Sequence, residues 1–244
     1  MIRILRKGLR FWYHMMVVLV FVLTYPFVYY YSRKPSRYRK LNSVRKLCSF
    51  LPSALSGIYY KCEFETKIDW SKTYIVCPNH SSNLDVFAMS MVMKNNFFFL
   101  GKDELLKNPI TATYFKTIDI PIKRDSKISA FRAFKKTSER ISEGMSPVIF
   151  PEGIIGEEYP PILHSFKSGP FRLAIEHKIP IIPVTIKDNW KILWDDGTIY
   201  GCKPGVSHIC IHKPIPTDHF DLKDDDLLRD LVYQKISSKL DYKL

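Results

Sequence analysis

The sequence predicts an α/β fold with a mixed, largely parallel sheet and flanking helices, preceded by an N-terminal helical segment that anchors the chain to a membrane. From about residue 61 onward, short apolar runs rich in β-branched and aromatic residues alternate with helical patterns, as in layered α/β proteins. Before that point, a long uncharged run lies between clusters of basic residues. We therefore expect residues 1–60 to form a basic, apolar membrane-anchoring segment and residues 61–244 to form one folded domain.

The uncharged run extends from Phe11 to Tyr31, which is just long enough to span a bilayer. Basic residues flank it on both sides, so the positive-inside rule leaves its orientation open. A single span would keep the folded domain cytoplasmic. A bent anchor in one leaflet, broken at Pro26 and returning through Val44–Tyr60, would place both basic flanks on the cytoplasmic face. The bent anchor is favoured because it leaves no basic cluster on the wrong side. Both arrangements predict a membrane protein whose folded domain lies on the cytoplasmic face.

The formal net charge of +13 arises in the N-terminal quarter of the chain, where no acidic residue precedes Glu63. A nucleic-acid-binding protein would more often spread its basic residues over its folded domain. Basic residues around an apolar run instead favour an anionic membrane surface, so we expect membrane lipids and no nucleic acid as partners. The five cysteines are scattered and form no C-x-x-C pair, which argues against a disulfide framework or a zinc site.

Predicted strands and helices alternate along the domain. Strands are expected at Thr73–Cys77, Phe97–Leu100, Ile118–Ile122, Pro147–Phe150 and Ile181–Ile186. Helices are expected at Leu84–Met93, Glu104–Lys116, Ser129–Glu143 (with Gly144 as its C-cap), Pro170–His177 and Asp224–Leu240. Residues 190–212 alternate like antiparallel strands, with turns at Asp196-Gly197 and Pro204-Gly205.

A histidine and an aspartate are the first candidates for chemistry. His80 and Asp85 lie in Asn79-His80-Ser81-Ser82-Asn83-Leu84-Asp85, between a predicted strand and a predicted helix. Ligands of α/β sheets gather at the carboxyl ends of strands. Asp85 could reach back to one imidazole nitrogen there, leaving the other free to take a proton from a hydroxyl. The spacing alone is weak evidence for a catalytic pair. An aspartate stabilises the first turn of any helix, and His219 and Asp224 repeat the same spacing.

Two further groups lie at predicted strand ends. Glu152 and Gly153 follow one apolar strand, and Lys123 with Arg124 follows another. Glu152 would face the same edge as His80 if the strands are parallel, with a solvated turn as the alternative. Adjacent lysine and arginine side chains can clamp a phosphate, or they can simply end a strand in solvent.

Five segments appear in a fixed order, and their series is more informative than any one of them. They are the H-x₄-D segment, Ile118-Asp119-Ile120-Pro121-Ile122-Lys123-Arg124, Phe150-Pro151-Glu152-Gly153, Phe166-Lys167-Ser168-Gly169-Pro170-Phe171 and Ile179-Pro180-Ile181-Ile182-Pro183-Val184. Over roughly residues 73–185, the series resembles the glycerolipid acyltransferase family, whose best-known members are the 1-acylglycerol-3-phosphate (lysophosphatidic acid) acyltransferases. The resemblance makes residues 61–244 an expected acyltransferase domain.

The resemblance implies direct transfer of a fatty acyl group to a lipid hydroxyl, without a metal, a cofactor or an acyl-enzyme. Acyl-CoA or acyl-carrier protein would be the co-substrate and a lysophospholipid the acceptor, with 1-acylglycerol-3-phosphate expected first. His80 would be the general base and Asp85 would orient it. The residues implied in acceptor binding are Arg124 for the phosphate, Glu152 and Gly153 for the shape of the site, and Lys102, Lys123 and Lys167 as further cations.

Two departures from the family pattern affect the acceptor. Ile154-Ile155-Gly156 follows Gly153 where the family usually continues Thr-Arg-Ser, so a second phosphate-binding arginine is missing. Asp119 stands where the second motif often has glycine. Another lyso-lipid acceptor therefore stays open as an alternative.

Three other functions are weighed against acyl transfer. A metal-dependent hydrolase would use His80, Asp85, Glu152 and His164, but the sequence has no H-x-H or H-E-x-x-H pattern. A serine hydrolase would use Ser81 or Ser82, which lack a nucleophile-elbow context and suit helix capping. A non-enzymatic basic membrane adaptor would explain residues 1–62, but it gives no reason for polar residues at the strand ends.

Overall fold

The computed structural model describes residues 2–123, 126–194 and 201–240. A seven-stranded sheet forms its centre, in the order β1-β7-β6-β2-β5-β3-β4. The strands are β1 (Ile58–Phe64), β2 (Ile75–Pro78), β3 (Phe97–Lys102), β4 (Ile120–Ile122), β5 (Ser146–Val148), β6 (Ile181–Ile186) and β7 (Gly205–Ile211). All neighbouring strands are parallel except β6 and β7, which are antiparallel, so the mixed, largely parallel sheet is confirmed.

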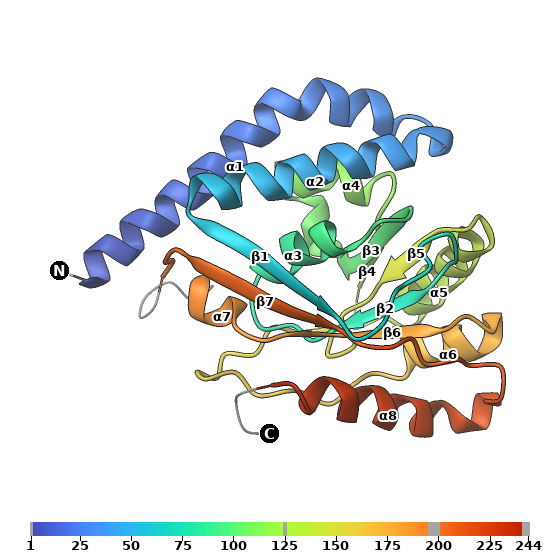
Figure 1. Cartoon of the computed structure of the whole chain (residues 1–244). Coiled ribbons are helices and arrows are strands. Elements are labelled where there is room, and N and C mark those ends of the chain that lie inside the picture. Colours follow the sequence, from blue (N-terminus) through green and yellow to red (C-terminus); the bar gives the residue numbers. More distant parts are fainter. Residues whose placement is uncertain (1, 124–125, 195–200, 241–244) are drawn as a thin grey trace.

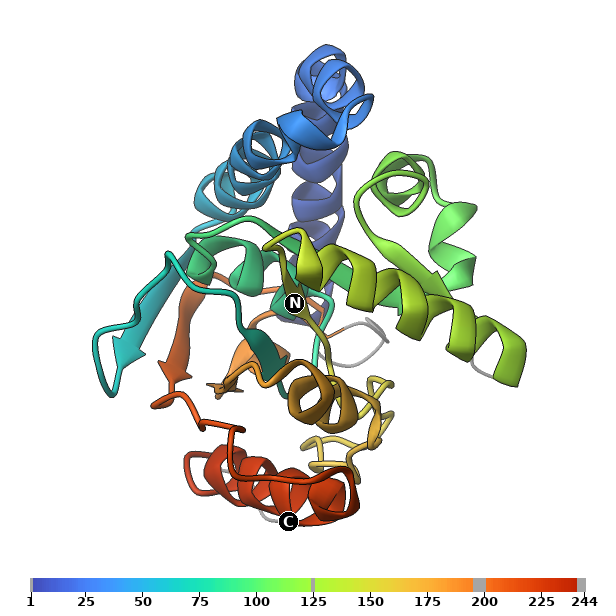
Figure 2. The ribbon, with the colours of Figure 1, turned by 90° about the vertical axis from the view of Figure 1, so that its right-hand side faces the viewer.

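Helices cover both faces of the sheet (Figure 1). They are α1 (Ile2–Ser32), α2 (Tyr38–Leu55), α3 (Leu84–Val92), α4 (Pro109–Phe115), α5 (Lys127–Ser142), α6 (Gly169–His177), α7 (Asn189–Ile192) and α8 (Asp225–Ser237), with short 3₁₀ turns at Pro35–Arg37, Asp103–Leu106 and Leu222–Asp224. Figure 2 shows α1 and α2 on the opposite side of the molecule from α8.

The central strands are apolar on both faces because both faces are covered. Every residue of β2 and β6 is buried, which explains their continuous apolar runs. Val76 packs in a cluster with Met89 of α3, whereas Ile75 and Cys77 pack in a cluster with Phe171 of α6 and with α8. The alternation along β2 therefore divides the core into two layers.

The N-terminal hairpin does not bend at the residue where a bent anchor was expected to break. α1 continues through Pro26 to Ser32, and the chain turns at Pro35–Arg37, so the predicted break at Pro26 is wrong. A proline removes one helical hydrogen bond, but α1 packs against α2 on both sides of it. Phe21 and Val28 are buried there, and the Thr24 hydroxyl lies 3.0 Å from Sγ of Cys48. This packing outweighs the lost bond.

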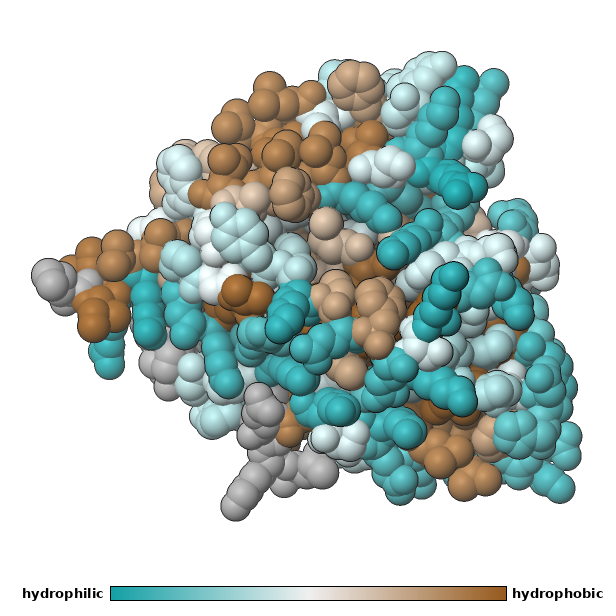
Figure 3. Space-filling model, in the orientation of Figure 1, coloured by the Kyte–Doolittle hydropathy of each residue, from teal (hydrophilic) through white to brown (hydrophobic). Residues whose placement is uncertain are grey.

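The hairpin exposes many large apolar side chains. α1 is long and apolar enough to cross a membrane by length and composition. Brown, apolar surface covers much of α1 and α2 in Figure 3. The exposed apolar residues of α1 and α2 include Phe11, Trp12, Val18, Leu19, Val22, Leu23, Phe27, Leu47, Phe50 and Leu55. Such a surface is typical of membrane-associated proteins; whether the hairpin spans a bilayer or enters one leaflet stays a prediction.

Three elements differ from the predicted ones. β1 begins at Ile58, inside the residues expected for the anchor. The expected helix Glu104–Lys116 is divided, because Pro109 starts α4 and the Asn108 side chain caps it by accepting from the Ile110 N–H. Residues 190–192 belong to the helix α7 rather than to an extended segment, and the expected turn at Asp196-Gly197 lies outside the described residues.

Candidate active site

His80 and Asp85 are joined by a hydrogen bond at the carboxyl edge of the sheet. His80 follows β2, and Asp85 lies in the first turn of α3. His80 Nδ1 lies 3.0 Å from Oδ2 of Asp85, and the aspartate is fully buried. The predicted pairing of these two side chains is therefore present in the structure.

The Asp85 carboxylate is held by three more donors. Its Oδ2 accepts the N–H groups of Ser81 and Ser82 at 2.7 and 2.8 Å. Its Oδ1 accepts Nδ2–H of Asn189, at the start of α7, at 2.8 Å. Asp85 thus both organises the loop before α3 and orients His80.

The His80 ring is held in place by its neighbours but stays partly accessible to solvent. It stacks on Phe150, with ring centroids 4.0 Å apart, and its side chain keeps 14% of its surface exposed. Among the described residues, Nε2 has no hydrogen-bond partner, whereas Nδ1 faces Asp85. A neutral imidazole with its proton on Nδ1 presents Nε2 as a free base to an incoming hydroxyl.

Glu152 lies beside His80, since β5 is the parallel neighbour of β2. Oε1 accepts the His80 N–H at 2.7 Å and Oε2 accepts the His164 N–H at 2.9 Å. The residue is only 4% exposed, so the interpretation as a solvated turn is wrong. Burial raises the pKa of Glu152 from 4.5 to about 8, although both N–H groups act to lower it. Glu152 therefore ties the His80 loop to the loop after β5.

Gly153 and Lys167 lie against each other beyond Glu152. Gly153 has φ +72°, and a Cβ placed on it would lie 3.2 Å from both Cε and Nζ of Lys167. The Lys167 N–H donates to the Pro151 carbonyl, which brings the fourth motif segment to the third. Because Gly153 has no Cβ, the Lys167 side chain can lie directly against the loop at this position.

The remaining cations end the strands on the far side of β5. Lys102 ends β3 and pairs with Ile122 of β4, so Lys102 and Lys123 lie at the same edge of the sheet as His80. Both are exposed or partly exposed. Arg124 lies outside the described residues.

Gly156, the third residue of the departure after Gly153, lies close to two side chains. A Cβ on Gly156 would lie 2.3 Å from Nε2 of His164 and 2.4 Å from Oε2 of Glu158. The serine that the family usually has there would require the tips of these two side chains to move.

The competing assignments receive no support from the described residues. In the second H-x₄-D pair, Asp224 forms a capping box with Asp221 rather than a bond with His219, and it accepts the Asp221 N–H. Ser82 caps α3 by accepting the Leu84 N–H, in place of Asn83. Among the residues described, the one cluster with metal-ligand geometry is Glu65, Cys210 and His212, at the opposite edge of the sheet. His80, Asp85, Glu152 and His164 do not form such a cluster.

Comparison with known proteins places this site in a family. Residues 60–187, more than half of the chain, match the family model described as Acyltransferase. The chain belongs to the acyltransferase family. The matched residues contain the His80–Asp85 pair, Glu152 and Lys167, whereas Asn189 lies beyond them.

Several known proteins are similar in sequence to the chain. It is 28% identical to an uncharacterized acyltransferase of Schizosaccharomyces pombe, over 74% of the chain and 65% of the relative. It is 27% identical to the chloroplastic 1-acyl-sn-glycerol-3-phosphate acyltransferase LPAT1 of Arabidopsis thaliana, over 82% of the chain and 54% of the relative. The chain thus covers between about half and two thirds of these relatives.

A solved structure shares the fold. The crystal structure of the 1-acyl-sn-glycerophosphate acyltransferase PlsC from Thermotoga maritima matches with a TM-score of 0.80 and 21% identity, over 97% of this chain and 95% of that chain. The match includes the N-terminal hairpin, so the hairpin and the α/β domain occur together in that protein as well.

Proposed function

We propose that the chain is a membrane-bound O-acyltransferase that moves a fatty acyl group from acyl-CoA or acyl-carrier protein to the hydroxyl of a lysophospholipid. The proposed acceptor is 1-acylglycerol-3-phosphate, which would give phosphatidic acid. The observation that carries the proposal is the His80 imidazole, held at Nδ1 by a buried Asp85 while Nε2 has no hydrogen-bond partner among the described residues.

In the proposed reaction, His80 acts as general base. Nε2 takes the proton of the acceptor hydroxyl as the hydroxyl oxygen attacks the thioester carbonyl carbon. The resulting tetrahedral intermediate expels the thiolate, and the proton passes from Nε2 to the sulfur. Asp85 stabilises the imidazolium that forms between the two steps and keeps the ring in the required tautomer.

The acceptor phosphate would bind to the cations beside this pair. Lys102, Lys123 and Lys167 are the described candidates, and Arg124 is expected to add a bidentate contact. Glu152 and Gly153 would shape the acceptor site, since Glu152 fixes the loop behind His80 and Gly153 leaves room for Lys167.

The hairpin of α1 and α2 would hold the site at the membrane where the lysophospholipid resides. Its exposed apolar side chains suit the acyl region of one leaflet, and its basic residues suit anionic headgroups. In this arrangement the domain lies on the cytoplasmic face, because neither basic flank has to cross the bilayer.

A second acceptor class is favoured by one observation. The loop after Gly153 carries isoleucines where the family usually has threonine and the second phosphate-binding arginine. A lysophospholipid whose phosphate is already part of a diester would need fewer cations than lysophosphatidate.

The experiment is acyl transfer by membranes that contain the wild-type chain, His80→Ala or His219→Ala, with labelled acyl-CoA or acyl-carrier protein and a panel of lyso-lipids. We expect transfer by the wild type and by His219→Ala, the matched control from the second H-x₄-D pair, and none by His80→Ala. Transfer by His80→Ala at the wild-type rate would overturn the mechanism. No transfer by the wild type to any acceptor would favour the membrane adaptor.

A further inference from the structure

The strand that leads to the predicted phosphate-binding residues is weakly held by the sheet itself. β4 has three residues and lies at the edge of the sheet, where its one neighbour is β3. Lys123 follows directly. The position of Lys123 relative to His80 therefore depends on whatever else fixes β4.

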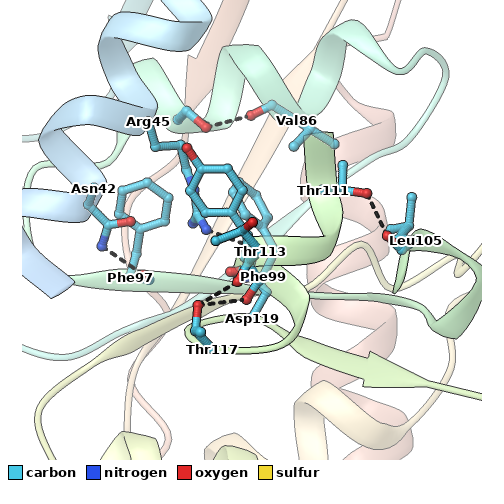
Figure 4. A network of polar contacts seen from close by, with 12 residues as sticks. Asn42, Arg45, Val86, Phe97, Phe99, Leu105, Thr111, Thr113, Thr117 and Asp119 are labelled. Carbon is cyan, nitrogen blue, oxygen red and sulfur yellow. Dashed lines mark hydrogen bonds and ion pairs between the residues drawn. The ribbon is translucent and has the colours of Figure 1, made fainter. Parts of the chain in front are cut away.

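A buried ion pair fixes β4 to the N-terminal hairpin. Nη2 of Arg45, on α2, lies 2.8 Å from Oδ2 of Asp119, the residue before β4. The two side chains are 8% and 4% exposed. The other carboxylate oxygen, Oδ1, accepts the Phe99 N–H of β3 at 2.9 Å. One aspartate thus joins α2 and β3 to the start of β4; Figure 4 shows Arg45, Phe99 and Asp119 within this network of polar contacts.

Aromatic rings surround the Arg45 guanidinium and leave it few hydrogen-bond partners other than Asp119. Its guanidinium lies over the rings of Phe97, Phe99 and Tyr114, at 5.4, 5.3 and 4.5 Å from their centroids. Nη1 is buried and has no hydrogen bond within the described part of the chain. Cation–π contacts of this kind strengthen when water is excluded, but Asp119 is the group that neutralises the charge.

The turn before β4 is held from a second side. The Asp119 N–H donates to the Tyr114 carbonyl at 2.8 Å, and Arg140 of α5 donates to the Thr117 carbonyl. The backbone on the N-terminal side of β4 is thus fixed by α2 and α5 together. The family's usual glycine at position 119 has no carboxylate to offer, so this attachment depends on the residue that departs from the pattern.

We propose that Arg45 and Asp119 are a positioning pair for the acceptor, which holds β4 and the lysine that follows it, Lys123, at a fixed place relative to the membrane-associated hairpin. This inference rests on the proposed function. It assigns the pair no contact with substrate. Loss of the pair lets β4 shift, so acceptor binding weakens while the His80–Asp85 pair keeps its geometry.

Three variants and one control test the pair. Asp119→Asn and Arg45→Met each leave one buried charge without its partner, and the double variant Arg45→Met/Asp119→Asn removes both charges. Removing one partner of a buried pair is far more destabilising than replacing both. Asn42→Leu is the control, because Asn42 lies one turn before Arg45 and bonds the Phe97 carbonyl and the Asn96 side chain without touching β4.

For each variant the KM for lysophosphatidate, the KM for acyl-CoA, kcat and the unfolding free energy are measured. We expect both single variants to raise the acceptor KM about tenfold, as misplacement of a binding group does, with kcat and the donor KM unchanged. In the double variant stability recovers while the acceptor KM stays raised. A double variant with wild-type acceptor KM would show a purely structural pair, and a raised acceptor KM in Asn42→Leu would show a general effect of loosening α2. Either result overturns the inference.

Hydrogen exchange separates failure of this inference from failure of the proposed function, since it needs no substrate. The amides of Ile120 and Ile122 should exchange faster in both single variants and in the double variant, and at the wild-type rate in Asn42→Leu. Unchanged exchange in the double variant would overturn the inference. Absence of transfer by the wild type would instead count against the proposed function.

Discussion

Asn189 Nδ2 donates a 2.8 Å hydrogen bond to the one oxygen of Asp85 that does not face His80. Both side chains are fully buried. The bond joins α7 to the first turn of α3, from residues 104 positions apart. Because this bond occupies Oδ1, the imidazole and two backbone N–H groups bond to Oδ2. Asn189 therefore sets the orientation of the carboxylate.

We therefore expect Asn189→Leu to lower kcat. Hydrogen bonds to charged groups contribute roughly 1.5–3 kcal/mol, which corresponds to a loss of roughly tenfold to a hundredfold. The KM of the acceptor should stay unchanged, because Asn189 lies behind Asp85. Steady-state kinetics together with thermal unfolding check this prediction. A kcat that falls only in proportion to the folded fraction would contradict it.

The stability of the protein should depend on pH through Glu152. Its pKa is raised from 4.5 to about 8 because the carboxyl is buried. Between these values the folded chain binds one more proton than the unfolded chain, so this contribution is fully present below about pH 4.5 and lost as the pH rises through about 8. Relative to Glu152→Gln, the wild type should lose about 1 kcal/mol of unfolding free energy per pH unit in this window. Urea unfolding across the window measures it, and parallel curves for the two proteins would contradict it.

Alanine substitutions at two glycines with positive φ should distinguish backbone strain from an effect on acceptor binding. Gly153 and Gly144 both have positive φ, +72° and +79°, but only Gly153 has Lys167 against it, and Gly144 has nothing within 4 Å. Alanine at either position should cost about 1 kcal/mol of stability. Gly153→Ala should also raise the KM of lysophosphatidate, because the new methyl group displaces Lys167. Equal acceptor KM values in Gly153→Ala and Gly144→Ala would show that Lys167 is not used.

The missing arginine can be returned to the loop. Ile155→Arg should lower the KM of lysophosphatidate by roughly three- to tenfold, since an arginine can bind a phosphate bidentately. Ile154→Arg, one position earlier and more exposed, is the matched control and should have a smaller effect. An unchanged acceptor KM in Ile155→Arg would favour an acceptor other than lysophosphatidate.

Local patterns predicted the parts of the fold that local patterns control. β2 and β6 are continuous apolar runs because both sheet faces are covered, and parallel strand ends brought His80 and Glu152 to one edge as expected. β1 escaped prediction because its sequence continues the N-terminal segment without a break in composition. The path of α1 through Pro26 is decided by α2, which no window of sequence around Pro26 contains.

The supporting residues of the site carry no sequence signal. Asn189 stands alone after β6 in an ordinary polar stretch, and its role follows only from the packing of α7 on α3. Arg45 and Asp119 are 74 positions apart, in segments that appeared to belong to different parts of the protein. The pairing of His80 with Asp85 could be predicted because the two residues are close in sequence, whereas Asn189, Arg45 and Asp119 are brought together with their partners from distant segments.

The ion pair between α2 and the β4 turn also constrains how this chain can diverge from its relatives. Each single replacement passes through a state with one uncompensated buried charge, so the two positions are expected to change together in descent. Homologues with glycine at the position of Asp119 should therefore have an uncharged residue at the position of Arg45. In such lineages the hairpin could change in length and sequence independently of the sheet. In this chain, the ion pair requires α2 and the β4 turn to change together.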